Sequence, residues 1–417
     1  MLPAAFITAT LALSVGTMSP DSADIDLLCV GLVPWNAQDR SGLSDSISTP
    51  TGSMPHDQLG SFGSGLAYTG RDNLYVACPD RGPADGAAAY FCRVQFMRIS
   101  LVPSEDGSEW SMRIECERTS LLRSARGEQF IGSAAAINPA EPARALRYDP
   151  EGIRVALDGS IIISDEYGPW VDRFSLDGRQ LARIPSPPSL FNPIQSGEAG
   201  KELPPAARTG RQPNRGMEGL AITPEGSRLY GIMQSPLIQD SGLDASNKRI
   251  GRNARIIEFH LREGAAGPRR QFVYQLEEAS HSLNEICAVS DRTFLVLERD
   301  GKAGAKAKFR SLYKIVLDGA SDVSRVPSLP AHTLPQGIRP VQKTAFLDLM
   351  EPRFGLAGAS MPEKIEGVTF GPDLPDGRRL LLVTTDNDFI EGNPSVIWAF
   401  AVDASLLPDF QSQLFEK

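Results

Sequence analysis

A short hairpin pattern recurs along the chain and restricts the folds that the chain can adopt. Each copy has a Glu-Gly or related pair, an apolar run, a polar turn, a second apolar run and then acidic or polar residues. The copy at residues 149–168 reads DPEGIRVALDGSIIISDEYG and has carboxylates at both open ends. Further copies begin at Glu218, Glu285 and Glu366, and a degenerate copy begins at Ser64. Such self-similarity indicates a repeat architecture.

Each hairpin is followed by further strand-like runs, so that one unit supplies about four strands. After the copy at Glu151 these runs are WVDRFSL and QLARIP, and after the copy at Glu218 they are RIIEFHL and QFVYQL. Four-stranded units repeated around an axis form an all-β fold, the β-propeller. A β-sandwich or two stacked sheets is the alternative, but sheet packing alone does not explain the matched acidic ends.

The last unit lacks a fourth strand, because only the run SVIWAFAV follows its hairpin. The N-terminal run IDLLCVGLV, residues 25–33, can supply that strand by pairing with residues 395–402. Such pairing buries two strand edges that would otherwise be exposed. We therefore expect a single propeller domain over residues 24–417, closed by the N-terminal strand.

The acidic ends of the hairpins predict a metal site. The first strand of each blade lines the central channel, and antiparallel pairing returns the end of the second strand to the start of the first. The carboxylates of all blades should therefore converge on one channel mouth, where like charges repel unless a cation or a base compensates them. The predicted ligands are Glu151, Glu218, Glu285, Glu366, Asp80, Asp165 and Asp386.

Oxygen ligands without an organised set of histidines or cysteines favour Ca²⁺ over zinc or copper. The alternative is that the carboxylates form an ordinary solvated rim. Basic residues stand beside them in the sequence and form either salt bridges or a clamp for a phosphate or carboxylate group. The candidate substrate-binding residues are Arg215, Lys364, Arg299 and, in the SDEYGP stretch, Tyr167.

Charge and hydropathy limit the partners and the location of the protein. The net charge of −9 and a pI of about 5.2 argue against nucleic acid or an anionic membrane surface, because either would require a basic face. No stretch after residue 20 is apolar enough to cross a bilayer. Residues 1–20 are uncharged and apolar, which predicts a signal peptide and a secreted or periplasmic protein.

Nucleophile and cofactor motifs give no support to other enzyme classes. The chain has no GxSxG, GxGxxG or P-loop pattern, and His281 is the one histidine near the predicted mouth. The cysteines have no zinc-like spacing. Because Cys78, Cys92 and Cys116 fall in successive predicted strands, one pair of them could form a disulfide after export.

Seven ordered strings resemble the phytase-like domain family, whose members are described as "esterase-like activity of phytase family" proteins. They are YDPEGI, SDEYGP, NRGMEGLAITPEG, MQSPL, FLVLERDG, KIEGVTF and TTDNDF, and the resemblance covers residues 60 to 403. The distant similarity of this family to β-propeller phytases implies six blades, calcium ions at the channel mouth and hydrolysis by metal-activated water. The chain departs from that pattern because it lacks the Asp-Asp-Pro string and has five hairpin repeats. Either residues 84–150 contain a sixth blade or the ring is smaller.

Two classes of function follow. The first is a calcium-dependent hydrolase of a phosphate or carboxylic ester, with a small anionic or ester substrate and no catalytic side chain assigned. The second is a non-catalytic propeller that binds a ligand on the same face with a structural calcium ion. A lactonase of the gluconolactonase type is a further alternative within the enzyme class, and fold alone does not decide among them.

Overall fold

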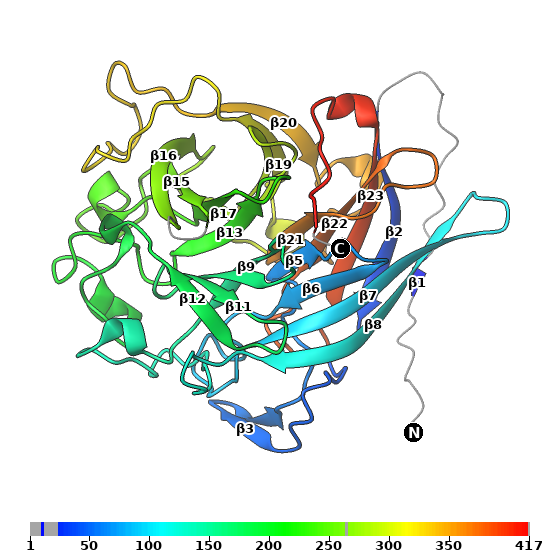
Figure 1. Ribbon diagram of the computed structural model, residues 1–417, viewed down its shortest axis with the longest axis horizontal. Coiled ribbons are helices and arrows are strands. Elements are labelled where there is room, and N and C mark those ends of the chain that lie inside the picture. Colours follow the sequence, from blue (N-terminus) through cyan, green and yellow to red (C-terminus); the bar gives the residue numbers. More distant parts are fainter. Residues whose placement is uncertain (1–9, 12–23, 263–265, 416–417) are drawn as a thin grey trace.

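Strands make up most of the regular structure, and they form five sheets around a common axis together with one separate two-stranded hairpin (Figure 1). The computed structural model describes residues 10–11, 24–262 and 266–415. Within these residues the only helices are short 3₁₀ turns. None of the described helices has the length and apolar character that a bilayer crossing would need.

Each sheet is one blade, and four of the blades use four consecutive strands. The first blade contains β5 (Gly65–Tyr68), β6 (Leu74–Cys78), β7 (Arg93–Pro103) and β8 (Trp110–Leu121). The second contains β9 (Pro150–Val155), β10 (Ile161–Asp165), β11 (Val171–Phe174) and β12 (Gln180–Ile184). The third contains β13 (Met217–Ile222), β14 (Arg228–Met233), β15 (Asn253–His260) and β16 (Gly267–Gln275). The fourth contains β17 (Ser282–Ala288), β18 (Thr293–Arg299), β19 (Arg310–Val316) and β20 (Gln342–Asp348).

The fifth blade joins the two ends of the chain. It contains β21 (Ile365–Phe370), β22 (Arg379–Thr385), β23 (Ser395–Val402) and β2 (Ile25–Val33), with β1 (Thr10–Leu11) at its edge. The separate hairpin is β3 (Ser46–Thr49) and β4 (Gly52–Pro55). The 3₁₀ turns are Pro142–Arg144, Pro188–Leu190, Ala199–Glu202, Ile238–Asp240, Gly304–Lys306, Pro352–Phe354 and Ala404–Leu406.

The propeller and its closure are confirmed. β2 pairs antiparallel with β23 from Ile25 opposite Val402 to Val33 opposite Ser395. The six blades that the family resemblance implied are wrong for this chain, because residues 84–150 contain only β7, β8 and the connection to β9. The predicted signal peptide at residues 1–20 lies outside the described residues except for β1.

The glycine of the repeated Glu-Gly pair allows neighbouring inner strands to approach closely. The first strands of the blades contact one another in the cyclic order β5, β9, β13, β17 and β21. A Cβ atom at Gly152 would lie 2.5 Å from Leu220 N, and one at Gly219 would lie 2.6 Å from Glu285 Cα. Such contacts are with the backbone, so any larger residue would push two strands apart. The glutamate of each Glu-Gly pair thus supplies a charge, and the glycine allows the inner strands to form a narrow ring.

The hydrophobic core lies between adjacent sheets. One cluster, for example, joins Ile162 and Val171 of the second blade to Leu220 and Ile257 of the third. All five cysteines are buried and free, so the disulfide considered among Cys78, Cys92 and Cys116 is wrong. They act as small apolar residues in this core.

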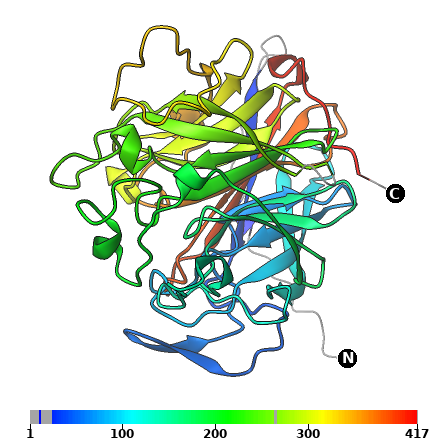
Figure 2. The ribbon, with the colours of Figure 1, turned by 60° about the vertical axis from the view of Figure 1, so that its left-hand side comes forward.

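The two ends of the channel differ. The connections that follow the second and fourth strands lie at the end where the inner strands begin, and the hairpin turns lie at the other. Residues 410–415 contact the inner-strand ends of all five blades at the turn end; for example, Gln411 N donates to Val289 O and Gln413 Nε2 to Val155 O. Figure 2 shows the long connection between β12 and β13 (green) and the C-terminus on opposite sides of the view.

Candidate functional site

In four blades, the pairing of the first two strands is interrupted by a bulge. The position of this bulge determines which residues of different blades are structurally equivalent. In β13 the pairing moves from Met217 opposite Met233 to Leu220 opposite Gly231, so Glu218 and Gly219 lie in the bulge. The second and fifth blades repeat this step around Glu151 and Glu366. In β17 the pairing moves from Leu283 to Glu285, which leaves Asn284 at the glutamate position and Glu285 at the glycine position.

Glu285 therefore lies inside the channel and not at its mouth. Its Oε1 atom accepts from Leu220 N at 3.1 Å and Ile286 N at 3.0 Å, and its Oε2 atom lies 3.1 Å from Arg154 Nη2. The guanidinium of Arg154 also donates to carbonyls of three other inner strands, at Leu66 O, Ile286 O and Val368 O. This ion pair and these hydrogen bonds join four of the inner strands below the mouth.

Asp165 is also outside the group at the mouth, because its carboxylate stabilises a turn. It accepts from the backbone N–H groups of Asp149 at 3.0 Å, Tyr167 at 3.0 Å and Gly168 at 3.1 Å. Burial raises the pKa of Asp165 to about 6, although the hydrogen bond from the backbone of Asp149 opposes the shift. Its role is to hold the strand ends of the second blade.

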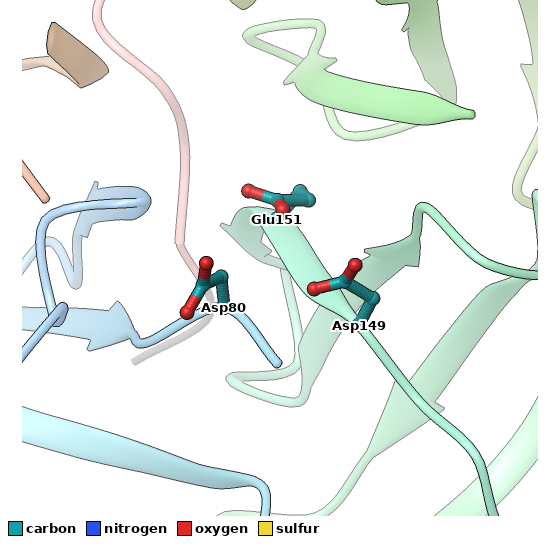
Figure 3. A group of neighbouring side chains, drawn as sticks. All are labelled: Asp80, Asp149 and Glu151. Atoms are coloured by element: carbon teal, nitrogen blue, oxygen red, sulfur yellow. The ribbon is translucent and has the colours of Figure 1, made fainter. Parts of the chain in front are cut away.

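The other five predicted metal ligands do lie together, with further carboxylates that the sequence reasoning did not select. Three groups have one carboxylate oxygen from each member within 4.8 Å of the others. These groups are Asp80, Asp149 and Glu151; Asp80, Asp386 and Asp388; and Glu151, Glu166 and Glu218. Figure 3 shows the first group, in which carboxylates from two neighbouring blades face a common space. Burial and other nearby carboxylates raise the pKa of Glu151 and of Glu218 most. The charge of Glu366 also contributes to both shifts, so Glu366 belongs to the same group.

One side of the mouth contains its own cation. Lys364 Nζ lies 2.8 Å from Asp386 Oδ2 and 3.1 Å from Asp80 Oδ2, and it also contacts Asp388. Burial alone would lower the pKa of Lys364, but the charges of Asp386 and Asp80 hold it well above its ordinary value. The ammonium group therefore occupies the place that an ion would take among these three aspartates. Lys364, predicted to bind substrate, is committed to internal ion pairs.

A second basic residue, Arg81, forms an ion pair with Asp149, which lies in one group with Asp80 and Glu151. Arg81 Nη1 lies 2.9 Å from Asp149 Oδ2 and 3.5 Å from Glu166 Oε2, and Arg81 also contacts Asp85. The backbone N–H of Arg81 donates to Asp149 Oδ1 at 2.7 Å. Asp149 is therefore fully engaged with one arginine.

The acidic triad of Glu151, Glu166 and Glu218 has much less compensation. Its three side chains are at most 5% exposed, and its one ion pair among the described residues is the 3.5 Å contact of Glu166 with Arg81. Burial raises the pKa of Glu151 well above its ordinary value, and the charge of Glu218 adds to the shift. Burial and the charge of Glu166 do the same to the pKa of Glu218.

Unused oxygen atoms surround this acidic triad. Glu166 Oε1 and Glu218 Oε2 are buried without a hydrogen-bond partner. The amide groups of Gln234 and Asn284 donate to Glu218 Oε1 at 2.7 and 2.9 Å, while their own carbonyl oxygens have no partner. Buried acceptors without donors are unfavourable unless a ligand satisfies them. The acidic triad and the two amides together form an oxygen-lined site that suits a cation.

The remaining predicted substrate-binding residues lie around this site. Arg299 Nη2 pairs with Glu366 Oε1 at 2.8 Å, and Arg215 Nη1 donates to Ser282 Oγ at 2.7 Å. Tyr167, with Arg81, lines a cavity of about 150 Å³ beside the acidic triad, where its hydroxyl donates to Gly132 O at 3.3 Å. Part of the cavity wall comes from the β12–β13 connection, at Ser196, Gly197, Ala199 and Glu202.

Sequence reasoning missed Asp149, Glu166, Asp388 and Asn284, although each stands within two residues of a predicted ligand. The signal for Asn284 was present, since Glu285 is the one glutamate of the repeat that is followed by isoleucine and not by glycine. Arg81 was missed because its partner Asp149 is 68 positions away in the sequence.

A family model described as "Phytase-like: Esterase-like activity of phytase" matches residues 57–389. The chain belongs to the phytase-like family. The matched region includes the whole acidic triad, Lys364 and Arg81. A relative named "Uncharacterized secreted protein" from Arthroderma benhamiae is 26% identical over 91% of this chain and 90% of its own length.

Solved structures also resemble the chain, at low similarity. A beta-1,3-galactosidase of the GH43 group is 9% identical, covers 88% of this chain and 94% of its own, and has a TM-score of 0.43. A gluconolactonase from Xanthomonas campestris is 14% identical, covers 95% and 99%, and has a TM-score of 0.34. Regucalcin, a calcium-binding protein from Agrobacterium tumefaciens, is 10% identical, covers 88% and 82%, and has a TM-score of 0.33.

Proposed function

We propose that the protein is a calcium-dependent hydrolase of phosphate or carboxylic esters, and that the mouth of its propeller is the active site. The observation that supports this most is the acidic triad, in which buried carboxylates lie together with unpartnered oxygens and almost no compensating base. Membership of the phytase-like family is consistent with this chemistry.

The oxygen-lined site has the chemistry that calcium prefers. Ca²⁺ takes six to eight oxygen ligands at about 2.3–2.6 Å. Carboxylate oxygens within 4.8 Å of one another can therefore share one ion between them. Glu151, Glu166 and Glu218 would supply the charged ligands, and the carbonyl oxygens of Gln234 and Asn284 would supply neutral ones. Glu366 and the aspartates paired with Lys364 would form the surrounding charge.

A bound calcium ion would supply positive charge that polarises a carbonyl or phosphoryl oxygen. The side chains of the protein would position the substrate next to it. Arg81 and Tyr167 line the adjoining cavity. Burial lowers the pKa of Arg215, and the nearby charges of Glu166 and Glu218 oppose this shift. The ion pair of Arg154 and Glu285 lies below this site, inside the channel.

The location of the protein is part of the proposal. The named relative is described as secreted, and residues 1–20 have the composition of a signal peptide. We infer that the protein is exported, to the periplasm or to the exterior.

The test is an assay of the purified protein against an aryl phosphate, an aryl acetate, phytate and a lactone. We expect turnover of at least one ester in calcium, its loss on chelation, and a fall of more than about tenfold in Glu218→Gln. Glu105→Gln is the matched control, since Glu105 lies exposed in the turn between β7 and β8. Turnover that survives exhaustive chelation would contradict the proposal. Turnover of the lactone alone would identify a lactonase, and no turnover would favour a binding module.

A further inference from the structure

A group of arginines on the third and fourth blades lies beside the acidic triad. Arg215 precedes β13, Arg249 lies in the connection between β14 and β15, and Arg299 ends β18. Arg215 Nη1 donates to Ser282 Oγ, and Ser282 is the cross-strand partner of Arg299. All three therefore reach the mouth end of the channel from two neighbouring blades.

The hydrogen-bond donors of this group are only partly used. Arg249 Nη1 and Arg299 Nε are buried and have no partner, and Arg299 is only 6% exposed. Among the described residues, neither Arg215 nor Arg249 forms an ion pair with a carboxylate. The one ion pair in the group is that of Arg299 with Glu366. Buried donors without acceptors are unfavourable, and an acceptor from a ligand would remove that penalty.

The charges of the three guanidinium groups act on one another. Burial, together with the charges of Arg215 and Arg299, lowers the pKa of Arg249 to about 10. At neutral pH Arg249 still carries its charge. Like charges held together in a partly dry site destabilise the protein unless a negative group lies between them.

We propose that Arg215, Arg249 and Arg299 form an oxyanion subsite, and that it holds a carboxylate or phosphate group of the substrate. Guanidinium groups suit this ligand because they offer planar, paired donors to both kinds of oxyanion. The subsite lies next to the oxygen-lined site, so an anionic ester can reach both. The reference to a substrate rests on the proposed function, whereas the binding of an oxyanion does not.

The test is calorimetric titration of inorganic phosphate, and separately of acetate, into metal-free protein. The metal is removed on a chelating resin, so that no anionic chelator competes, and ionic strength is held constant. We expect saturable binding of at least one anion at one site, and the tighter anion identifies the group that the subsite prefers. Arg249→Gln and Arg215→Gln should each weaken this binding by at least about tenfold. Arg208→Gln, at an exposed arginine of the preceding connection, should leave it unchanged.

A second measurement separates anion binding from a structural role. In anion-free buffer Arg249→Gln should melt above the wild-type protein, because the substitution removes an unpaired charge. A lower melting temperature would mean that Arg249 has a stabilising role inside the protein, and it would overturn the proposal. So would the absence of saturable binding, or equal binding by the Arg249→Gln and Arg208→Gln variants.

The outcomes also distinguish this inference from the proposed function. If phosphate or acetate binds and no ester is hydrolysed, the oxyanion subsite stands and the hydrolase falls. If esters are hydrolysed in calcium and neither anion binds, the hydrolase stands and the subsite falls. A preference for an aryl ester of a dicarboxylic acid over aryl acetate, lost in Arg249→Gln, would further support the subsite through its effect on KM.

Discussion

The ammonium group of Lys364 lies 2.8 Å from Asp386 Oδ2, in the middle of an aspartate group that has the geometry of an ion site. This relationship divides the mouth into two parts. The aspartates of the first and fifth blades have a cation built into the chain, while the acidic triad of the second and third blades has only the 3.5 Å contact of Glu166 with Arg81. A single divalent ion bound at the acidic triad would balance most of the remaining negative charge of these three glutamates.

Replacing Lys364 with methionine should remove the internal cation. Loss of one partner from a buried ion pair costs about 3 kcal/mol or more, so we expect a decrease of this size in the free energy of unfolding in metal-free buffer. Calorimetry should also show a second calcium ion in Lys364→Met, because Asp80, Asp386 and Asp388 become available. Lys201→Met, at an exposed ion pair with Glu198, is the control. An unchanged calcium stoichiometry would argue against the division of the mouth.

Gly219→Ala should destabilise the ring. The added methyl group would lie 2.6 Å from Glu285 Cα and 2.7 Å from Ile286 N, which are backbone atoms of the next inner strand. Overpacking of this kind costs about 1–3 kcal/mol, and here the strands must also separate. Urea unfolding measures the effect. Gly200→Ala, at a site with no atom within 4 Å, should change stability little, and equal effects at both positions would refute the close approach of β13 and β17.

Glu285 should make stability depend on pH. Burial raises its pKa from the ordinary 4.5 to about 7, even though Arg154 opposes the shift. The folded protein then binds a proton more tightly than the unfolded chain, so the contribution of Glu285 is fully present below pH 4.5 and is lost as pH rises to about 7. Over that window the free energy of unfolding should fall by about 3 kcal/mol on account of this residue.

Glu285→Gln should remove that part of the pH dependence. Denaturant unfolding at several pH values between 4.5 and 8 measures the difference between the variant and the wild-type protein. The curve of the variant should be flatter, with its largest gain at the alkaline end. Parallel curves would show that Glu285 ionises in the channel as readily as in water.

The fold could be predicted from the sequence because its determinants are local and repeated. Glu-Gly pairs, apolar runs and turns mark each inner hairpin, and the run at residues 25–33 matched the missing strand of the last blade. The number of blades followed from counting repeats, whereas the expectation of six came from distant relatives. Sequence could not predict that no sixth blade lies in residues 84–150, because β7 and β8 are long strands with a weak repeat signal.

The candidate site could be predicted only in part. Convergence of Glu151, Glu218 and Glu366 follows from strand direction, which the repeat makes visible. The position of Glu285 depends on a bulge of one residue, and a shift of one residue moves a side chain to another face. Ion pairs such as Arg81 with Asp149, and Lys364 with Asp80, join residues 68 and 284 positions apart, so no local pattern predicts them.

Calcium binding at the acidic triad is the central claim, and the calcium-induced shift in melting temperature tests it most directly. An ion that binds only the folded form stabilises it by about 2.7 kcal/mol at a concentration one hundredfold above Kd. We predict that calcium raises the melting temperature of the wild-type protein and of Glu105→Gln equally, and that Glu218→Gln loses most of this rise. The same rise in Glu218→Gln as in Glu105→Gln, or no rise in the wild-type protein, would contradict the account.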